Sequence, residues 1–277
     1  MRFTAMLNSI LLVSTVTTFH VTKGAAAYAL SLAEHFGANI SALILDLPGA
    51  VAMTDDGPQN VETTDISMAF KHATDDIRGE ADRRGLSLFS IDSWSRALGV
   101  LAAVTDLARL HDAVIMGCDP TGMLSEQGIA EHVMFEAGRP LFLIPADHRE
   151  PFAAKRVALA WDNSPSSARA LGAAMPLLLD AETVTLIQIG GEKDIASTLI
   201  DLDIAEYLQR RRLNAEIIHR VRGKSSVGDA LLAVALEHSA DLLVMGGYGH
   251  SRLREFLLGG VTRRMFDGAP MPLMLVH

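Results

Sequence analysis

Short runs of β-branched and aliphatic residues alternate along this chain with longer segments whose apolar residues recur every three or four positions. Short apolar runs between polar turns predict buried strands, and the longer segments predict helices that face a core. In the first half, the predicted strands are 10–16, 39–45, 87–93, 113–117 and 141–145, and the predicted helices are 22–36, 65–84, 97–110 and 122–137.

The second half repeats this order of elements. Its predicted strands are 156–161, 183–189, 215–221, 241–246 and 273–276, and its predicted helices are 166–179, 195–212, 227–238 and 260–266. Strands that alternate with helices form a parallel sheet, because each helix returns the chain to the start of the next strand. The pattern predicts an α/β fold of two tandem five-stranded parallel sheets with flanking helices, Rossmann-like in class.

Two pairs of matching fragments indicate that one unit occurs twice. The run 112–117 (DAVIMG) resembles 241–246 (DLLVMG), and 140–145 (PLFLIP) resembles 272–277 (PLMLVH). The polar stretch 146–155 separates the copies, as is typical of a domain boundary. We expect two domains, at 1–149 and 150–277.

Composition narrows the classes of function. The 277 residues carry a net charge of −9, which argues against a general nucleic-acid-binding surface because such a surface needs clustered cations. Cys118 is the only cysteine, so an intrachain disulfide and a cysteine zinc cluster are excluded and a cytoplasmic location is expected. No apolar run is long enough to predict a membrane span, and the run after Arg2 is interpreted as a first strand instead of a secretory signal.

Glycines gather after the fourth predicted strand of the second half. They are Gly246, Gly247, Gly249, Gly259 and Gly260. The first group permits a sharp turn and a close approach of the backbone to a ligand, at the strand ends where parallel sheets bind their ligands. The second group opens a predicted helix, whose first N–H groups favour an anion such as phosphate. Glycines between a strand and a helix also serve as plain turn formers, so this alternative stays open.

The segment fits neither of two common nucleotide motifs. Gly223-Lys224-Ser225 resembles the end of a phosphate-binding loop, but the first glycine of that loop would fall at Ile218. The dinucleotide fingerprint fails because no glycine follows Gly249 three residues later. A nucleotide site in this segment must therefore be of another type.

The glycine spacing resembles the nucleotide motif of the universal stress protein family. Gly249 follows Gly246 after two residues, Gly259 follows after nine more, and 272–276 resembles the usual last strand of the family. The resemblance covers both copies and is stronger in the second. It implies a five-stranded parallel fold of the adenine nucleotide alpha hydrolase-like type, dimerisation, and binding of ATP with or without Mg²⁺.

The resemblance also implies a set of binding residues. They are Asp162, Ile189, Gly246, Gly249, Gly259, Gly260, Val261 and Thr262. The glycines and Val261 would contact phosphates through the backbone, Asp162 would lie beside the nucleoside, and Ile189 would lie near adenine. Asp162 also suits a turn or helix cap, and Thr262 suits either a phosphate contact or simple placement in the first helical turn.

Two departures from the family pattern affect these expectations. Gly260 stands where a small hydroxyl or amide residue is usual, which keeps the backbone donor but loses a side-chain hydrogen bond worth about 0.5–1.5 kcal/mol. The first copy has no Asp or Glu before residue 34. In its phosphate loop, Pro120 stands where a glycine belongs and removes an N–H donor, and Asp119 adds repulsion toward phosphate. We expect that copy not to bind ATP in the same way, and to act as a packing partner or to hold another ligand.

Other candidate groups are weaker. His132 and Glu136 are ordinary helix neighbours, Cys118 is interpreted as an inert thiol, and His250 and Arg252 could reach phosphates or stay solvated. Two classes of function remain open.

The first class is a stress-response protein that binds ATP as a conformational ligand, and the second is a ligand-free interaction module. A slow ATP hydrolase that uses His250 or Asp162 is the enzymatic alternative. The last strands, 141–145 and 273–276, could pair within one chain as a pseudo-dimer, and a homodimer of chains is also open.

Overall fold

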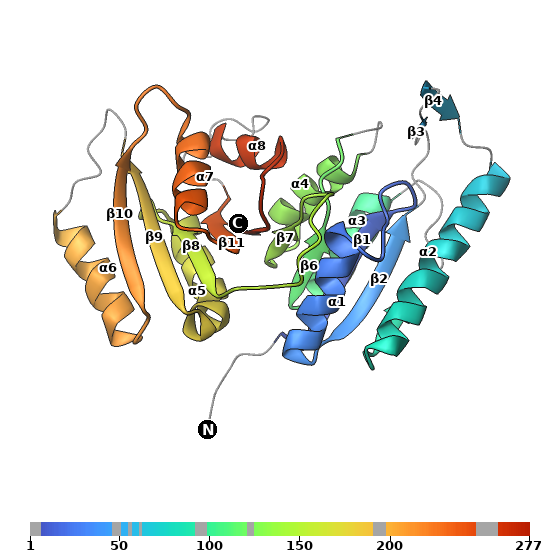
Figure 1. The fold of residues 1–277 in the computed structure, drawn as a ribbon, viewed down its shortest axis with the longest axis horizontal. Coiled ribbons are helices and arrows are strands. Elements are labelled where there is room, and N and C mark those ends of the chain that lie inside the picture. Colours follow the sequence, from blue (N-terminus) through green and yellow to red (C-terminus); the bar gives the residue numbers. More distant parts are fainter. Residues whose placement is uncertain are drawn as a thin grey trace. The chain divides into compact units, whose positions relative to one another are not determined.

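The computed structural model describes residues 7–45, 51–54, 57–60, 63–91, 99–120, 125–190, 198–247 and 260–277. The chain divides into two compact units, with the division in the sequence between Phe152 and Ala153. Each unit contains parallel strands and flanking helices, as the sequence pattern predicted (Figure 1). Among the described residues, no helix is both long enough and apolar enough to span a bilayer.

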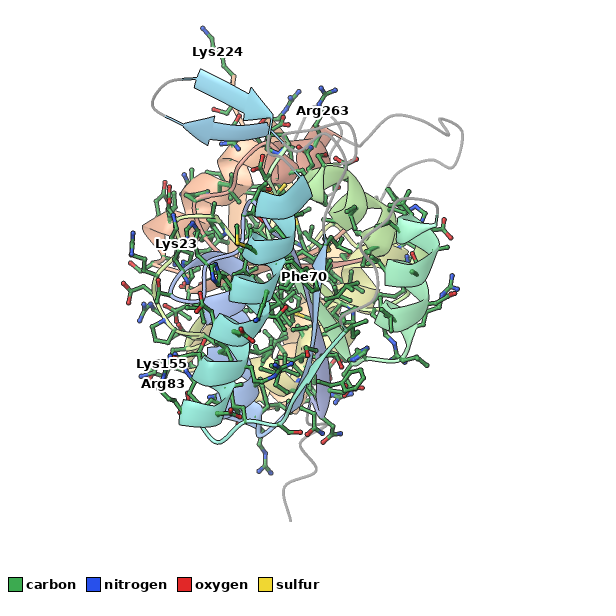
Figure 2. All side chains as sticks on the ribbon, turned by 90° about the vertical axis from the view of Figure 1, so that its right-hand side faces the viewer. Lys23, Phe70, Arg83, Lys155, Lys224 and Arg263 are labelled. Carbon is green, nitrogen blue, oxygen red and sulfur yellow. The ribbon has the colours of Figure 1, made fainter. Side chains whose placement is uncertain are left out.

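The first unit has the strand order β7-β6-β1-β2-β5. Its strands are β1 (Ser9–Thr15), β2 (Asn39–Leu45), β5 (Leu88–Ser90), β6 (Ala113–Met116) and β7 (Leu141–Leu143), and its helices are α1 (Gly24–Phe36), α2 (Thr63–Arg83), α3 (Val100–Arg109) and α4 (Glu126–Glu136). β1 pairs in parallel with β2 and β6, so both its edges are used and residues 10–13 are fully buried. Side chains fill the space around these elements (Figure 2).

A short antiparallel pair in the first unit was not predicted. It consists of β3 (Val51–Thr54) and β4 (Gly57–Asn60). Gly57 and Pro58 are depleted in strands, so the sequence offered little signal for β4. The predicted strand 87–93 is shorter in the structure, where β5 covers Leu88–Ser90.

The second unit has the strand order β10-β9-β8-β11-β12. Its strands are β8 (Arg156–Ala160), β9 (Thr183–Gly190), β10 (Ala215–Val221), β11 (Leu242–Gly246) and β12 (Leu273–Val276), and its helices are α5 (Pro165–Asp180), α6 (Thr198–Arg210), α7 (Val227–Glu237) and α8 (Gly260–Phe266). The order runs outward from β8 in both directions. The segments that leave β8 and β11 therefore diverge, which leaves a crevice at the carboxyl ends of these strands.

Matching aspartates make the same contacts in the two units. The Asp112 carboxylate accepts hydrogen bonds from the backbone N–H groups of Asn8 and Ser9 at 2.8 and 3.0 Å. The Asp241 carboxylate accepts them from Lys155 and Arg156 at 3.1 and 2.8 Å. Each aspartate thus fixes the start of the neighbouring central strand, which supports the internal duplication.

The segment up to Phe152 packs on α1 of the first unit. The Phe152 backbone N–H donates to Ser31 Oγ at 2.7 Å, and its ring lies 5.6 Å from that of Tyr28 between centroids. Burial of this phenyl ring, which is 9% exposed, explains why the first compact unit extends to residue 152.

Candidate functional site

A cavity of about 270 Å³ lies at the carboxyl ends of β8 and β11 in the second unit. That volume is near the lower end of the range for small-molecule sites, about 300–1,000 Å³. Its lining residues are Ala160, Trp161, Asp162, Ser167, Ile187, Ile189, Val227, Leu231, Met245, Gly246, Gly260, Val261 and Thr262. Most of these side chains are apolar, and a few polar groups lie among them, which is the usual composition of a ligand site.

The polar side of the cavity is built by the turn from β8 into α5. The Asp162 carboxylate accepts a hydrogen bond from the Ser164 N–H at 3.0 Å, and Asn163 has a positive φ of 57°. Ser164 caps α5, since its hydroxyl accepts the Ser167 N–H at 3.2 Å. Asp162 therefore stabilises the turn and also lines the cavity, so its two interpretations are compatible.

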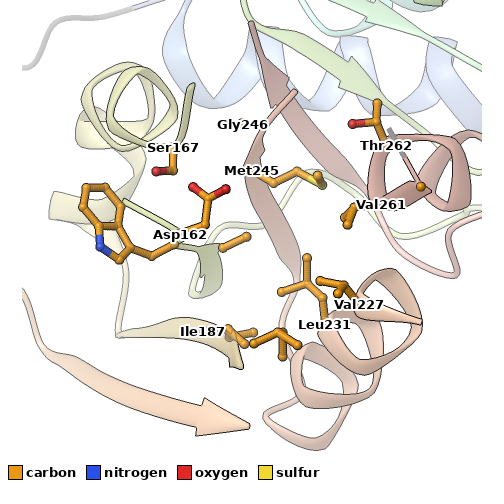
Figure 3. A pocket seen from close by; sticks show the side chains of 13 residues that line it. Asp162, Ser167, Ile187, Val227, Leu231, Met245, Gly246, Val261 and Thr262 are labelled. Carbon is orange, nitrogen blue, oxygen red and sulfur yellow. The ribbon is translucent and has the colours of Figure 1, made fainter. Parts of the chain in front are cut away.

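Gly246 ends β11 directly against the start of α5. A Cβ at this position would lie 2.5 Å from the Ser166 carbonyl carbon and 2.6 Å from the Ser167 nitrogen. Both atoms are backbone, so they cannot move without shifting α5. Only glycine lets the strand and the helix approach this closely, and this approach places Asp162 and Ser167 beside the strand end (Figure 3).

The opposite side of the cavity comes from α7 and α8. Figure 3 shows Val227 and Leu231 of α7, and Val261 and Thr262 of α8, on the far side of β11 from Asp162. Thr262 is buried, with 2% of its surface exposed, whereas a Cβ on Gly260 would meet no atom of the described residues within 4 Å. A side chain at position 260 would thus have room beside the cavity.

An ion pair fixes α8 against α7. Arg264 Nε donates to Asp229 Oδ1 at 2.6 Å, and the Ser226 hydroxyl, which caps α7, donates to Asp229 Oδ2 at 2.6 Å. These hydrogen bonds lower the pKa of Asp229, with the Ser226 bond the larger cause. Gly228 allows the contact, because a Cβ there would lie 2.9 Å from Arg264 Cβ.

The cavity brings together every expected binding residue that the structure describes. These are Asp162, Ile189, Gly246, Gly260, Val261 and Thr262. Gly249 and Gly259 lie outside the described residues. The sequence did not predict the apolar lining from Ile187, Leu231 and Met245. Ile187 could have been predicted, because it lies two residues before Ile189 and therefore on the same face of the strand.

The first unit has a cavity at the matching strand ends, but its chemistry differs. Gly117 corresponds to Gly246, and a Cβ on Gly117 would lie 2.5 Å from Glu126 Oε2 instead of from a helix backbone. Asp119 donates its backbone N–H to the same carboxylate oxygen at 3.4 Å. A carboxylate of the protein therefore occupies a position beside this loop, which agrees with the expectation that the first copy does not accept phosphates in the same way.

A metal cluster is not evident in the described part of the chain. No three His, Cys, Asp or Glu side chains there are arranged to hold an ion.

Comparison with known proteins identifies the second unit. The model of the universal stress protein family matches residues 153–277. No curated protein matches the chain in sequence.

Several solved structures share the fold. A universal stress protein from Archaeoglobus fulgidus DSM 4304 aligns with a TM-score of 0.71 and 15% identity over 97% of this chain and 96% of that chain. A protein from Pseudomonas aeruginosa UCBPP-PA14 described as a universal stress protein aligns with a TM-score of 0.64 and 15% identity over 98% and 93% of the two chains. A universal stress protein solved in complex with cAMP has 26% identity over 46% of this chain and 98% of its own, with a TM-score of 0.36.

The first two alignments cover both units, so they confirm the α/β fold of the whole chain. Residues 153–277 thus match the universal stress protein family, and the first unit shares the fold of the solved universal stress proteins.

Proposed function

We propose that residues 153–277 bind an adenine nucleotide, with ATP as the expected form, in the cavity at the ends of β8 and β11. One observation carries the proposal. The six described residues of the expected set come from four separate parts of the sequence, and all of them line this one cavity. Plain turn-forming glycines would not need to share a cavity with Asp162 and Ile189.

The apolar part of the cavity suits a purine base. Ile187 and Ile189 of β9 line one part of it, and Val227 and Leu231 of α7 line another. A flat aromatic base buries its faces favourably against such side chains. Asp162 lines the same cavity, and a carboxylate in this kind of fold can accept hydrogen bonds from ribose hydroxyls.

The phosphate end would lie toward Gly246 and the start of α8. The first N–H groups of a helix have no partner within the helix, and the backbone at Gly260 is open to the cavity. If ATP carries Mg²⁺, the hydroxyl of Thr262 is a hard oxygen donor of the kind this ion prefers.

ATP would act as a conformational ligand for a regulatory or stress-response role. Asp162 is the sole ionisable side chain among the described lining residues, and its carboxylate already accepts the Ser164 N–H. Rapid hydrolysis needs a group placed to activate or orient water. We therefore expect phosphate release to be much slower than nucleotide binding and dissociation.

Calorimetric titration of the full chain with Mg·ATP tests the proposal. We expect saturable binding of one nucleotide per chain, because the first unit has a carboxylate beside its phosphate loop. Phosphate release measured on the same sample separates a ligand from a substrate. Heat of binding that is absent at millimolar nucleotide would favour the interaction module instead. The cytoplasmic location, the pairing of strands 141–145 and 273–276, and a homodimer stay predictions.

A further inference from the structure

Glu126 is a carboxylate buried in the first unit beside a cavity. It is the first residue of α4, and only 4% of its surface is exposed. Its Oε1 accepts the Thr18 hydroxyl at 3.0 Å, and its Oε2 accepts the Asp119 N–H at 3.4 Å. These donors are neutral, so they solvate the carboxylate without cancelling its charge.

Among the described residues, no cation compensates the charge of Glu126. Burial raises the pKa of Glu126 to about 7, hydrogen bonds from Thr18, Asp119 and Ser14 lower it in part, and the negative charge of Asp119 raises it further. No Lys, Arg or His among the described residues forms an ion pair with this carboxylate. A buried charge without a cation is costly, and a cation that reaches it is bound favourably.

The neighbouring cavity has room for such a cation. Its volume is about 350 Å³, and Ser14, Thr17 and Thr18 contribute hydroxyl groups to its lining. The other charged or titratable side chains that line it are His20, Lys23 and Asp119, together with the Cys118 thiol. Lys23, labelled in Figure 2, pairs with Asp147 at 3.3 Å, so its charge is already matched. The buried carboxylate of Glu126 beside this cavity disfavours phosphate there.

We propose that the cavity of the first unit binds a small organic cation whose primary ammonium group pairs with Glu126. The ammonium group has three N–H donors, and the carboxylate is the acceptor that it would meet at the buried end of the cavity. Hydroxyl or amine groups elsewhere on the ligand would contact Ser14 and Thr17. This site is chemically opposite to the nucleotide cavity of the second unit and does not depend on it.

Calorimetry with 2-aminoethanol and 1,4-diaminobutane as probes tests this site on the full chain. Ethylene glycol, which has a similar size and no charge, is the matched ligand control. We expect saturable binding of at least one amine and none of the glycol. Because the ammonium group favours the ionised form of Glu126, whose pKa is about 7, affinity should be about tenfold higher at pH 8 than at pH 6.

Two carboxylate variants test whether the amine binds at Glu126. Glu126→Gln should lower amine affinity by about tenfold or more, since the charge is lost while the shape is kept. Glu136→Gln removes an exposed carboxylate at the other end of α4 and should change nothing. His20→Gln should keep the pH dependence, which excludes His20 as its origin.

A measurement on the wild-type protein tests whether the amine pairs with Glu126 even if Glu126→Gln does not fold. Titrations at pH 7 in two buffers with different heats of ionisation should show release of about half a proton per amine bound, because Glu126 is about half protonated there. The proposal is overturned if neither amine binds, if ethylene glycol binds equally well, if no proton is released, or if Glu126→Gln binds as the wild type does.

Discussion

The α-carbon of Gly246 lies so close to Ser166 that a Cβ on the glycine would meet the Ser166 carbonyl carbon at 2.5 Å. The end of β11 and the first turn of α5 therefore lie in close contact, mainly through backbone atoms. This contact sets the distance between the strand end and Asp162, and with it the width of the cavity.

Gly246→Ala should destabilise the second unit by about 1–3 kcal/mol, as expected for overpacking against atoms that cannot move freely. It should also weaken nucleotide binding, because α5 must shift. Gly172→Ala is the matched control, since Gly172 lies in α5 and a Cβ there meets nothing within 4 Å. That control should be stabilising by about 0.5–1 kcal/mol, because alanine favours helix over glycine. Chemical denaturation of both variants measures the difference.

Asp162→Asn should lower ATP affinity by roughly tenfold, because a hydrogen bond to a charged group is worth about 1.5–3 kcal/mol and the amide retains part of it. Stability should change little, since the amide oxygen can still accept the Ser164 N–H. Asp180→Asn, at the end of α5, serves as the control. Equal affinities for the two variants would assign Asp162 to the turn alone.

Gly260→Ser should raise ATP affinity. The position is open to the cavity, so the hydroxyl fits without displacing other atoms, and one neutral hydrogen bond adds about 0.5–1.5 kcal/mol, or roughly two- to tenfold in affinity. Gly260→Ala adds the Cβ without the hydroxyl and separates hydrogen bonding from packing. Affinity that falls in the serine variant would mean that phosphate does not lie at the start of α8.

The stability of the first unit should depend on pH through Glu126. Burial raises the pKa of this carboxyl from its ordinary value of 4.5 to about 7, so the folded state holds its proton more tightly than the unfolded state. Stability is then lost as pH rises from about 4.5 to 7, by an amount on the order of 3 kcal/mol.

Glu126→Gln should remove the loss of stability between about pH 4.5 and 7. The variant should therefore be more stable than wild type at pH 8, with the difference shrinking toward pH 5. Denaturation curves at both values check the sign. A variant that is less stable at pH 8 would show that the ionised carboxylate contributes more through its hydrogen bonds than its burial costs.

Local patterns in the sequence predicted the elements and their order well. The helix at 260–266 has the predicted bounds, and the repeated Asp112 and Asp241 make matching contacts at the starts of the central strands. Such features depend on spacing and on a few residues that are near in sequence. The hairpin of β3 and β4 had no such signal, because Gly57 and Pro58 do not resemble a strand.

The residues that line the cavity could be predicted only in part from the sequence. A motif could select Asp162 and Gly246, but it could not show that Leu231 and Met245 complete the lining, since contacts between separate elements leave no fixed spacing. Glu126 was missed for the same reason. The family pattern places an acid at the end of the first strand, whereas the first unit has its buried acid at the start of α4, which follows β6.

Trp161 offers the most direct test of the nucleotide site, because it lines the cavity and the chain has only one other tryptophan, Trp94. In a Trp94→Phe protein, Mg·ATP should produce a saturable change in Trp161 fluorescence, and Asp162→Asn in the same background should shift that curve to higher nucleotide concentration. Fluorescence that stays constant up to millimolar ATP, or a curve that Asp162→Asn leaves in place, would contradict nucleotide binding in this cavity.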